Sequence, residues 1–137
     1  MLPLTADPLR PEGGVNVVAH VDSGCRPFTI ISDALVQQAG LVLEDRPTRL
    51  RLADKVTVVE SQHMTTFSLR VTILEHPRLF TISAVVWKAD QVVEPLVIGQ
   101  ADALRTGLSV FVHDNKLREA ILGQHALHHD AESGPIP

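Results

Sequence analysis

Short apolar runs rich in β-branched residues follow one another along most of the chain, and polar or glycine-containing turns separate them. Runs of this kind are typical of many short strands rather than of a helical bundle. Their spacing is close to that of a small barrel or sandwich, so we expect an all-β fold. The predicted strands are Val15 to Val21, Phe28 to Ile31, Thr48 to Leu52, Val56 to Glu60, Thr65 to Leu74, Arg78 to Trp87, Val92 to Ile98, Ser109 to His113 and Leu117 to Leu122.

Two short helices are expected between the strands. Ser32 is a favourable N-cap residue, and Gly40 suits the left-handed position that ends a helix, so a helix is predicted between them. A second helix is expected from Gln100 to Arg105, with Gly107 ending it. The polar stretch Ser61 to Met64 predicts a bulge or a turn between two strands.

The two ends of the chain differ in composition from the middle. Residues 1–14 contain three prolines and a Gly-Gly pair, and residues 123–137 finish in Ser-Gly-Pro-Ile-Pro, so we expect an extended lead-in and a flexible tail. Residues 15–122 are then the folded domain. Within it, Asp114-Asn115 lies between two apolar runs and predicts a tight hairpin.

Composition and charge exclude several classes of function. The 137 residues suffice for about one domain, and 12 basic against 16 acidic side chains give a net charge of −4, which argues against a nucleic-acid surface. Four Phe, one Trp and no Tyr provide little for base stacking. The single cysteine, Cys25, allows no intramolecular disulfide and fits a reducing compartment. Without an apolar run near the roughly 20 residues of a membrane span, and without a signal-peptide pattern, a cytoplasmic location is expected.

A carboxylate stands where a buried strand is expected to end. Asp22 follows the apolar run that begins at Val15, and a charge in such a place is costly unless it is hydrogen-bonded or used. Ser23 and Gly24 allow a tight turn that directs backbone N–H groups at the carboxylate. An isolated Asp-Ser-Gly is most often only a turn between strands, so the rest of the chain has to decide.

The tripeptide belongs to an ordered series of segments. Asp22-Ser23-Gly24-Cys25 is followed by Ile31-Ser32, a helix and Gly40-Leu41, then by Leu52-Ala53-Asp54-Lys55, and finally by Val97-Ile98-Gly99 before a helix. This series resembles the retropepsins, the single-domain aspartic proteases of retroviruses and gypsy-type retrotransposons. It is also similar to the related domain of DNA-damage-inducible ubiquitin-shuttle proteins. The resemblance covers roughly residues 15–122 and implies a single-lobed acid-protease β-barrel with one or two short helices.

The resemblance implies a role for each matching residue. Asp22 would be the catalytic carboxylate, Ser23 would brace the two active-site loops, and Gly24 would bind the substrate backbone through its carbonyl. The segment Leu52-Ala53-Asp54-Lys55 would form the flap hairpin over the substrate. Val97-Ile98-Gly99 would be a second ψ-shaped turn, packed behind the catalytic loop.

Two positions depart from the family pattern. Lys55 stands where the flap tip usually has glycine, and Arg26 stands where a small or acidic residue is usual. The departure at Lys55 keeps a non-catalytic, retropepsin-like dimerisation or peptide-binding module open as an alternative function. A protease domain of the ubiquitin-shuttle type is the other alternative.

The chain holds only one Asp-Ser-Gly, whereas aspartic proteases place two carboxylates around one water. The unprotonated carboxylate takes a proton from the water that attacks the peptide carbonyl, and the protonated one donates to the carbonyl oxygen. The second Asp22 must therefore come from a second copy of the chain in a C2 homodimer. No cofactor is needed, and activity is expected at acidic to mildly acidic pH.

Several neighbours of the tripeptide are candidate substrate-binding residues. His20 lies two residues before Asp22, so strand alternation places both on one face, and we predict that His20 helps to form a subsite near the scissile bond. The alternative is a strand-end histidine that is merely hydrogen-bonded. Cys25 lies beside the catalytic loop, where a small buried apolar side chain is the alternative. An ion pair between Arg26 and Asp102 would tie the second helix to the loop.

Other chemistries have weaker support. His125, His128 and His129 could hold a metal on a helix, but no carboxylates support them in a segment expected to be a tail, so no metal is predicted. A serine hydrolase is disfavoured because no Gly-x-Ser-x-Gly occurs. The sequence thus predicts a homodimeric aspartic endopeptidase for extended peptides or a polyprotein, in the cytoplasm or inside a virus-like particle, without nucleic acid or membrane as a partner.

Overall fold

Burial alternates along the first strand of the chain. In the computed structural model, β1 (Glu12–Val21) buries Val17, Ala19 and Val21, whereas Val18 between them is 44% exposed. Successive side chains of a strand point to opposite faces, so one face of β1 joins the core and the other stays open. The structure describes residues 10–22, 28–51, 58–91, 94–112 and 114–125.

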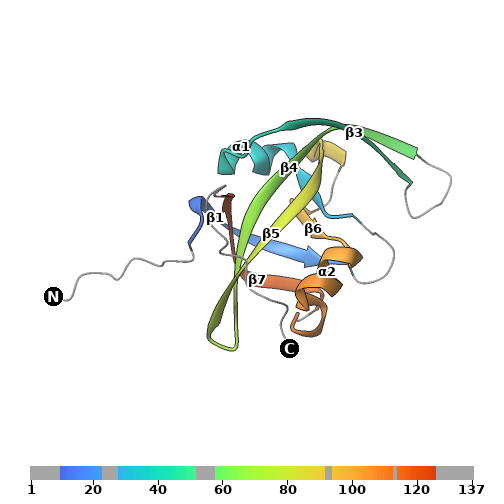
Figure 1. The fold of residues 1–137 in the computed structure, drawn as a ribbon. Coiled ribbons are helices and arrows are strands. Elements are labelled where there is room, and N and C mark those ends of the chain that lie inside the picture. The colour runs from blue at the N-terminus through green and yellow to red at the C-terminus, as the bar shows by residue number, and fades with distance from the viewer. Residues whose placement is uncertain (1–9, 23–27, 52–57, 92–93, 113, 126–137) are drawn as a thin grey trace.

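Strands make up most of the described chain, and short helices connect some of them (Figure 1). No helix in these ranges is long and apolar enough to cross a bilayer. The elements after β1 are β2 (Ile30–Ser32), α1 (Asp33–Ala39), β3 (Glu44–Arg51), β4 (Val58–Ile73), β5 (His76–Trp87), the 3-10 helix η1 (Ala89–Gln91), β6 (Leu96–Ile98), α2 (Gln100–Thr106), the 3-10 helix η2 (Leu108–Val110) and β7 (Lys116–Gln124).

Six of the strands close into a barrel. The strand order is β3-β4-β5-β2-β6-β1-β7, and an additional antiparallel pairing of β7 with β4, which includes Leu69 opposite Leu122, joins the two sides. Strand β3 lies outside the closed ring and pairs with β4. The predicted all-β barrel with short helices is therefore confirmed.

The barrel has a main core and a smaller apolar cluster. Fully buried Phe67, Phe80 and Ile98 belong to the main core. Ile30 packs in the second cluster with Val85 and Trp87, whereas its neighbour Ile31 packs in the main core. Since adjacent residues of a strand face opposite ways, the two clusters lie on opposite faces of the sheet.

Both predicted helices form, and their predicted ends are confirmed. The Ser32 hydroxyl accepts a hydrogen bond from the Leu35 N–H at 3.2 Å, which caps α1. Gly40 and Gly107 follow α1 and α2 with φ of 65° and 77°, values that favour glycine.

The turn predicted as one option at Ser61 to Met64 is wrong, because β4 runs unbroken through this stretch for 16 residues. The other option, a bulge, is found in the pairing: the register shifts between the pairs Asp45–His63 and Thr48–Ser61, with the extra residue on β3. Polar residues predicted a turn there, but the structure gives the hydroxyl of Ser61 a partner. The buried Ser61 Oγ donates to the Val86 carbonyl oxygen of the neighbouring strand at 2.5 Å. A polar side chain satisfied in this way does not end a strand.

The predicted strand Ser109 to His113 is also wrong over its described part. The chain keeps turning after Gly107, and η2 forms with the Phe111 N–H donating to the Leu108 carbonyl at 3.1 Å. Asp114 and Asn115 form the predicted tight turn with φ of 53° and 58°, although no described strand precedes it. Strand β6 starts at Leu96, later than predicted.

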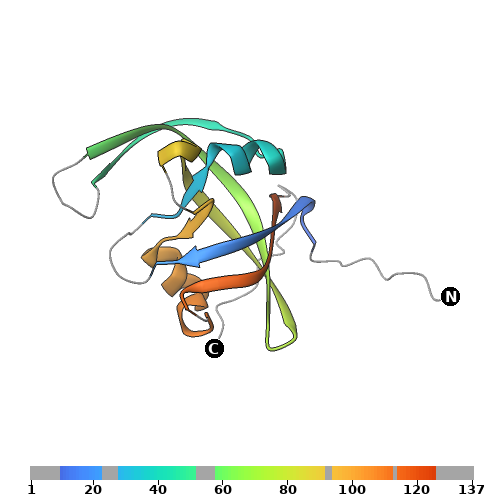
Figure 2. The same ribbon diagram turned by 180° about the vertical axis from the view of Figure 1, so that it is seen from behind.

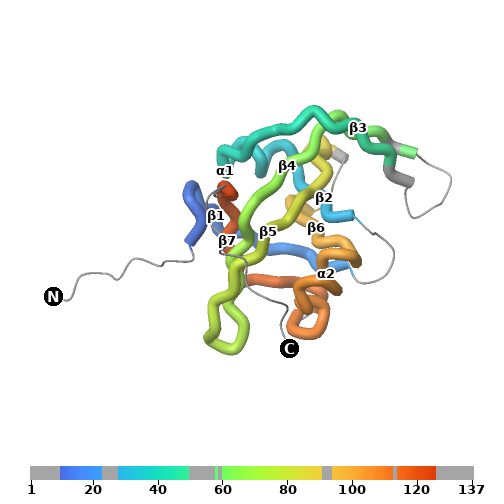
Figure 3. The backbone as a smooth tube through the Cα atoms, in the orientation of Figure 1, coloured from blue at the N-terminus to red at the C-terminus, as the bar shows by residue number. Residues whose placement is uncertain are grey.

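Strand β3 and the first part of β4 form an arm that extends away from the barrel (Figures 1 and 3). Two ion pairs cross the described part of this β3–β4 arm: Arg49 with Glu60 at 2.7 Å and His63 with Asp45 at 3.2 Å. Exposed ion pairs of this kind contribute little to stability, so the arm depends mainly on its backbone pairing.

Candidate functional site

Asp22 lies at the end of a buried strand. Val21 before it is 1% exposed and belongs to the core, whereas Asp22 is partly buried. The Asp22 N–H donates to the Ile98 carbonyl oxygen at 2.9 Å, and the Val21 N–H donates to the Asn115 carbonyl oxygen at 2.7 Å. The end of β6 and the turn before β7 thus fix the backbone that carries the carboxylate.

Strand β6 runs between β1 and β2 beside Asp22. It pairs in parallel with β1, with His20 opposite Val97, and antiparallel with β2, with Ile30 opposite Val97. The chain therefore leaves β1 on one side of β6 and returns as β2 on the other. Figure 2 shows the end of β1 beside β6 and α2. The connection holds Ser23, Gly24 and Cys25, which lie outside the described residues.

Thr29 joins β2 to the start of α2, a role that no pattern in the sequence indicates. Its side chain is buried, and its Oγ1 donates to Asp102 Oδ2 at 2.5 Å and accepts from the Gly99 N–H at 3.1 Å. Its carbonyl oxygen accepts from the Val85 N–H at 2.9 Å. Thr29 thus links β5, Gly99 and α2, and Gly99 directly follows Ile98, whose carbonyl oxygen accepts from the Asp22 N–H.

The carboxylate of Asp102 has two described partners. Besides accepting from Thr29, its Oδ1 lies 3.4 Å from a guanidinium nitrogen of Arg105, which also donates to the Thr81 carbonyl at 2.7 Å. Arg26 lies outside the described residues, so the predicted Arg26–Asp102 ion pair stays a prediction. The carboxylate of Asp102 serves the structure at the start of α2.

His20 and Val97 share the open face of the sheet. Val17, Ala19 and Val21 point into the core, so alternation directs His20 the other way, and Val97 is its direct partner in β6. Val97 is buried and His20 is partly buried. The sequence prediction that His20 and Asp22 point to one face agrees with this alternation.

The predicted flap residues Ala53, Asp54 and Lys55 lie outside the described residues. On either side of them, β3 and β4 pair antiparallel as far as Arg51 opposite Val58. The segment therefore connects two paired strands at the end of the β3–β4 arm.

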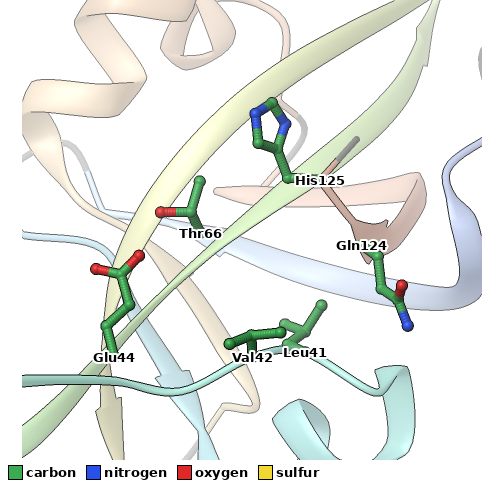
Figure 4. Close-up of a pocket in the computed structure, with 6 residues that line it drawn as sticks. All are labelled: Leu41, Val42, Glu44, Thr66, Gln124 and His125. Atoms are coloured by element: carbon green, nitrogen blue, oxygen red, sulfur yellow. The ribbon is translucent and has the colours of Figure 1, made fainter. Parts of the chain in front are cut away.

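Two cavities lie elsewhere on the described chain. One of about 250 Å³ is formed where the start of β3, β4 and the end of β7 meet. Its polar lining residues are Glu44, Thr66, Gln124 and His125 (Figure 4). The other, of about 360 Å³, lies between β1 and α1 and includes Asn16 and Gln38. Neither is lined by Asp22, so the chemistry predicted for that carboxylate belongs to neither.

Metal-binding groups are not gathered in the described part of the chain, where no set of three His, Cys, Asp or Glu side chains could hold an ion. His125 is the last described residue, and its Nδ1 lies 3.4 Å from Ser68 Oγ. His128 and His129 fall beyond it. The question of a metal at this cluster thus lies outside the described residues.

Comparison with known proteins gives no match to a protein-family model, to a curated protein or to a solved structure. The site has to be interpreted from its own geometry.

Proposed function

We propose that the chain is one protomer of a homodimeric, retropepsin-like aspartic endopeptidase in which Asp22 supplies one of two catalytic carboxylates. The observation that carries the proposal is the place of Asp22. A carboxylate follows a core strand, its backbone N–H is bonded to Ile98, and the chain around it passes across β6 from β1 to β2. Together with the Asp-Ser-Gly sequence, this arrangement supports a catalytic rather than a simple turn role.

The second carboxylate comes from a second copy of the chain. Asp102, which lies near the end of β6, already bonds Thr29 and Arg105 and belongs to the support of the site. Two Asp22 carboxylates across a C2 axis would share one proton, activate a water between them and protonate the carbonyl oxygen of the peptide. Activity is highest at acidic pH because the pair must keep that proton.

The substrate is an extended peptide, and polyprotein processing in the cytoplasm or in a virus-like particle is the proposed setting. An extended chain presents alternate side chains to one face, where His20 and Val97 lie beside Asp22. The connection at the end of the β3–β4 arm would cover it as a flap. No cofactor takes part in this mechanism.

The decisive experiment compares cleavage of a peptide library by the wild type, Asp22→Asn and the matched control Asp90→Asn, from pH 4 to 8. Asp90 is an exposed carboxylate in η1, so its amide variant should keep full activity. Asp22→Asn should lose more than about a thousandfold in kcat/KM. Peptide binding without cleavage by any of the three proteins would favour the non-catalytic module that Lys55 leaves open.

Mixed dimers test whether one site needs two chains. At concentrations that saturate the dimer, adding an equal amount of Asp22→Asn protein should reduce activity to about half, because random exchange leaves a quarter of the doubled dimer pool with two carboxylates. Adding Asp90→Asn protein should instead raise activity. Unchanged activity after the Asp22→Asn addition would show that each protomer acts alone.

A further inference from the structure

Lys116 and His20 face each other on the open side of the sheet, next to Asp22. They are direct partners in the antiparallel pairing of β1 with β7. The adjacent pair, Ala19 and Leu117, is buried in the core, so the side chains of Lys116 and His20 point to the opposite face. Directly paired residues have Cβ atoms about 5 Å apart, which brings the two side chains together.

Lys116 offers a cation without a counter-ion in the described part of the chain. Its side chain is partly buried, and no ion pair joins it to another described residue. The other charged side chains on this stretch of β7 are those of Arg118 and Glu119, both exposed, and Asp114 precedes the strand. The register shifts by one residue between the pairs Ala19–Leu117 and Val17–Ala120, so β7 bulges at Arg118 and Glu119 and simple alternation ends at Leu117. Lys116 is therefore the charged residue of β7 that the pairing places opposite His20.

His20 offers a hydrogen-bond donor to the same space. Its Nδ1 is buried and has no hydrogen-bond partner among the described residues, although the residue as a whole is partly exposed. A histidine ring carries hydrogen on at least one nitrogen, and Nε2 is the nitrogen of His20 left for a ligand. With a hydrogen on Nε2, the ring presents an N–H donor at this edge.

We infer that Lys116 and His20 form a subsite for the acidic side chain of a substrate residue next to the scissile bond. An ammonium and an imidazole N–H are both donors, and a carboxylate accepts from both. The charge of Lys116 also offsets the repulsion between that carboxylate and the Asp22 pair. The inference rests on the proposed function, because Asp22 defines where the scissile bond lies.

The test uses pairs of peptides that differ only in Glu or Gln beside the cleaved bond of a well-cleaved sequence. The wild type should cleave the Glu peptide with about tenfold higher kcat/KM than the Gln peptide, the expected size for a hydrogen-bonded charge. Lys116→Met keeps most of the stem and should bring the ratio close to one. Lys116→Arg keeps the charge and should retain the preference.

Arg118→Met is the matched control, since it removes a positive charge two residues along the same strand and should leave the ratio unchanged. His20→Phe should lower the Glu preference by less than Lys116→Met does, because the ammonium remains. Thermal unfolding of each variant shows whether the fold is intact. Equal kcat/KM for the Glu and Gln peptides in the wild type would overturn the subsite. So would a loss of the Glu preference in Arg118→Met as large as that in Lys116→Met. Neither result would contradict the proposed enzyme.

Binding separates the two proposals. Asp22→Asn protein, which should not cleave, is titrated with central-Glu and central-Gln decapeptide mixtures by fluorescence polarisation. The subsite is supported if Asp22→Asn binds the Glu mixture more tightly and the double variant Asp22→Asn, Lys116→Met does not. This result would support the subsite even if the wild type cleaved no peptide, and in that case only the enzyme proposal would fail. Equal binding of both mixtures overturns the subsite.

Discussion

The end of β1 and the β3–β4 arm are held in opposite ways, although both would contact the substrate of the proposed enzyme. At the end of β1, hydrogen bonds from Val21 and Asp22 reach two separate parts of the chain, and the buried Thr29 ties a third to them. In the β3–β4 arm, the ion pairs between described residues lie at the surface, where Arg49 and Glu60 are 78% and 52% exposed.

In the proposed enzyme, this difference would separate the part that must be precise from the part that must move. A carboxylate that activates water works only in a fixed geometry, and a buried hydrogen-bond network provides one. A covering segment has to admit and release a peptide, which needs a region of low local stability. The contrast therefore agrees with a rigid catalytic base under an adjustable cover.

The largest expected effect in this comparison comes from Thr29→Val. The substitution keeps the shape of the side chain but leaves Asp102 Oδ2 and the Gly99 N–H without their buried partner. We expect the free energy of unfolding to fall by about 3 kcal/mol, measured by urea denaturation. Peptidase activity per folded molecule should fall as well, because the support behind Asp22 is lost.

Thr29→Ser is the matched control, since it retains the hydroxyl and loses only a methyl group. Its cost should be near 1 kcal/mol. If the two variants unfold at the same urea concentration, the hydroxyl does not support the site and the contrast with the arm is weaker than the contacts suggest.

Local signals in the sequence predicted the parts of the fold that depend on a few adjacent residues. Ser32 and Gly40 bound α1 as expected, because a cap is a contact within one turn. The role of Thr29 could not be predicted, since its partners Gly99 and Asp102 lie 70 and 73 positions away. The turn predicted at Ser61 was wrong for the same reason, because the hydrogen-bond partner of Ser61, Val86, is 25 positions away.

The candidate site also has a part that adjacent residues predict and a part that depends on residues far apart in the sequence. The place of Asp22 at a strand end and the shared face of His20 follow from strand alternation, which is a local property. The bond from Asp22 to Ile98 and the pairing of His20 with Lys116 depend on which strands become neighbours. Such pairings are set by tertiary packing, which one sequence does not reveal.

Two turns, each with positive φ at two successive residues, show when residue types predict a turn and when they do not. Asp114 and Asn115 tolerate positive φ, and they predicted their turn. Leu74 and Glu75 form the turn between β4 and β5 with φ of 51° and 68°, and neither residue type favours this conformation. The pairing of two long strands imposes it.

Leu74→Asn should therefore stabilise the barrel. The Leu74 side chain is 78% exposed, so little packing is lost, and Asn suits the first central position of such a turn. We expect a gain of about 0.5 to 1 kcal/mol in the free energy of unfolding, measured as a higher urea midpoint with an unchanged slope. Leu74→Val, a β-branched residue at the same position, should lower the midpoint instead.

The smallest expected effect is that of Arg49→Met in the β3–β4 arm. Because both partners are exposed, losing the ion pair with Glu60 should change the free energy of unfolding by at most about 0.5 kcal/mol, and less in 0.5 M salt. The control is Arg46→Met, because Arg46 is an exposed residue of the same strand that forms no ion pair with another described residue. Hydrogen exchange should be faster at the amides of β3 than at those of β6 in all three proteins. If Arg49→Met lowered the free energy of unfolding by more than about 1 kcal/mol, ion pairs would be holding the arm in place. A cover held by ion pairs would open and close with ionic strength rather than with substrate.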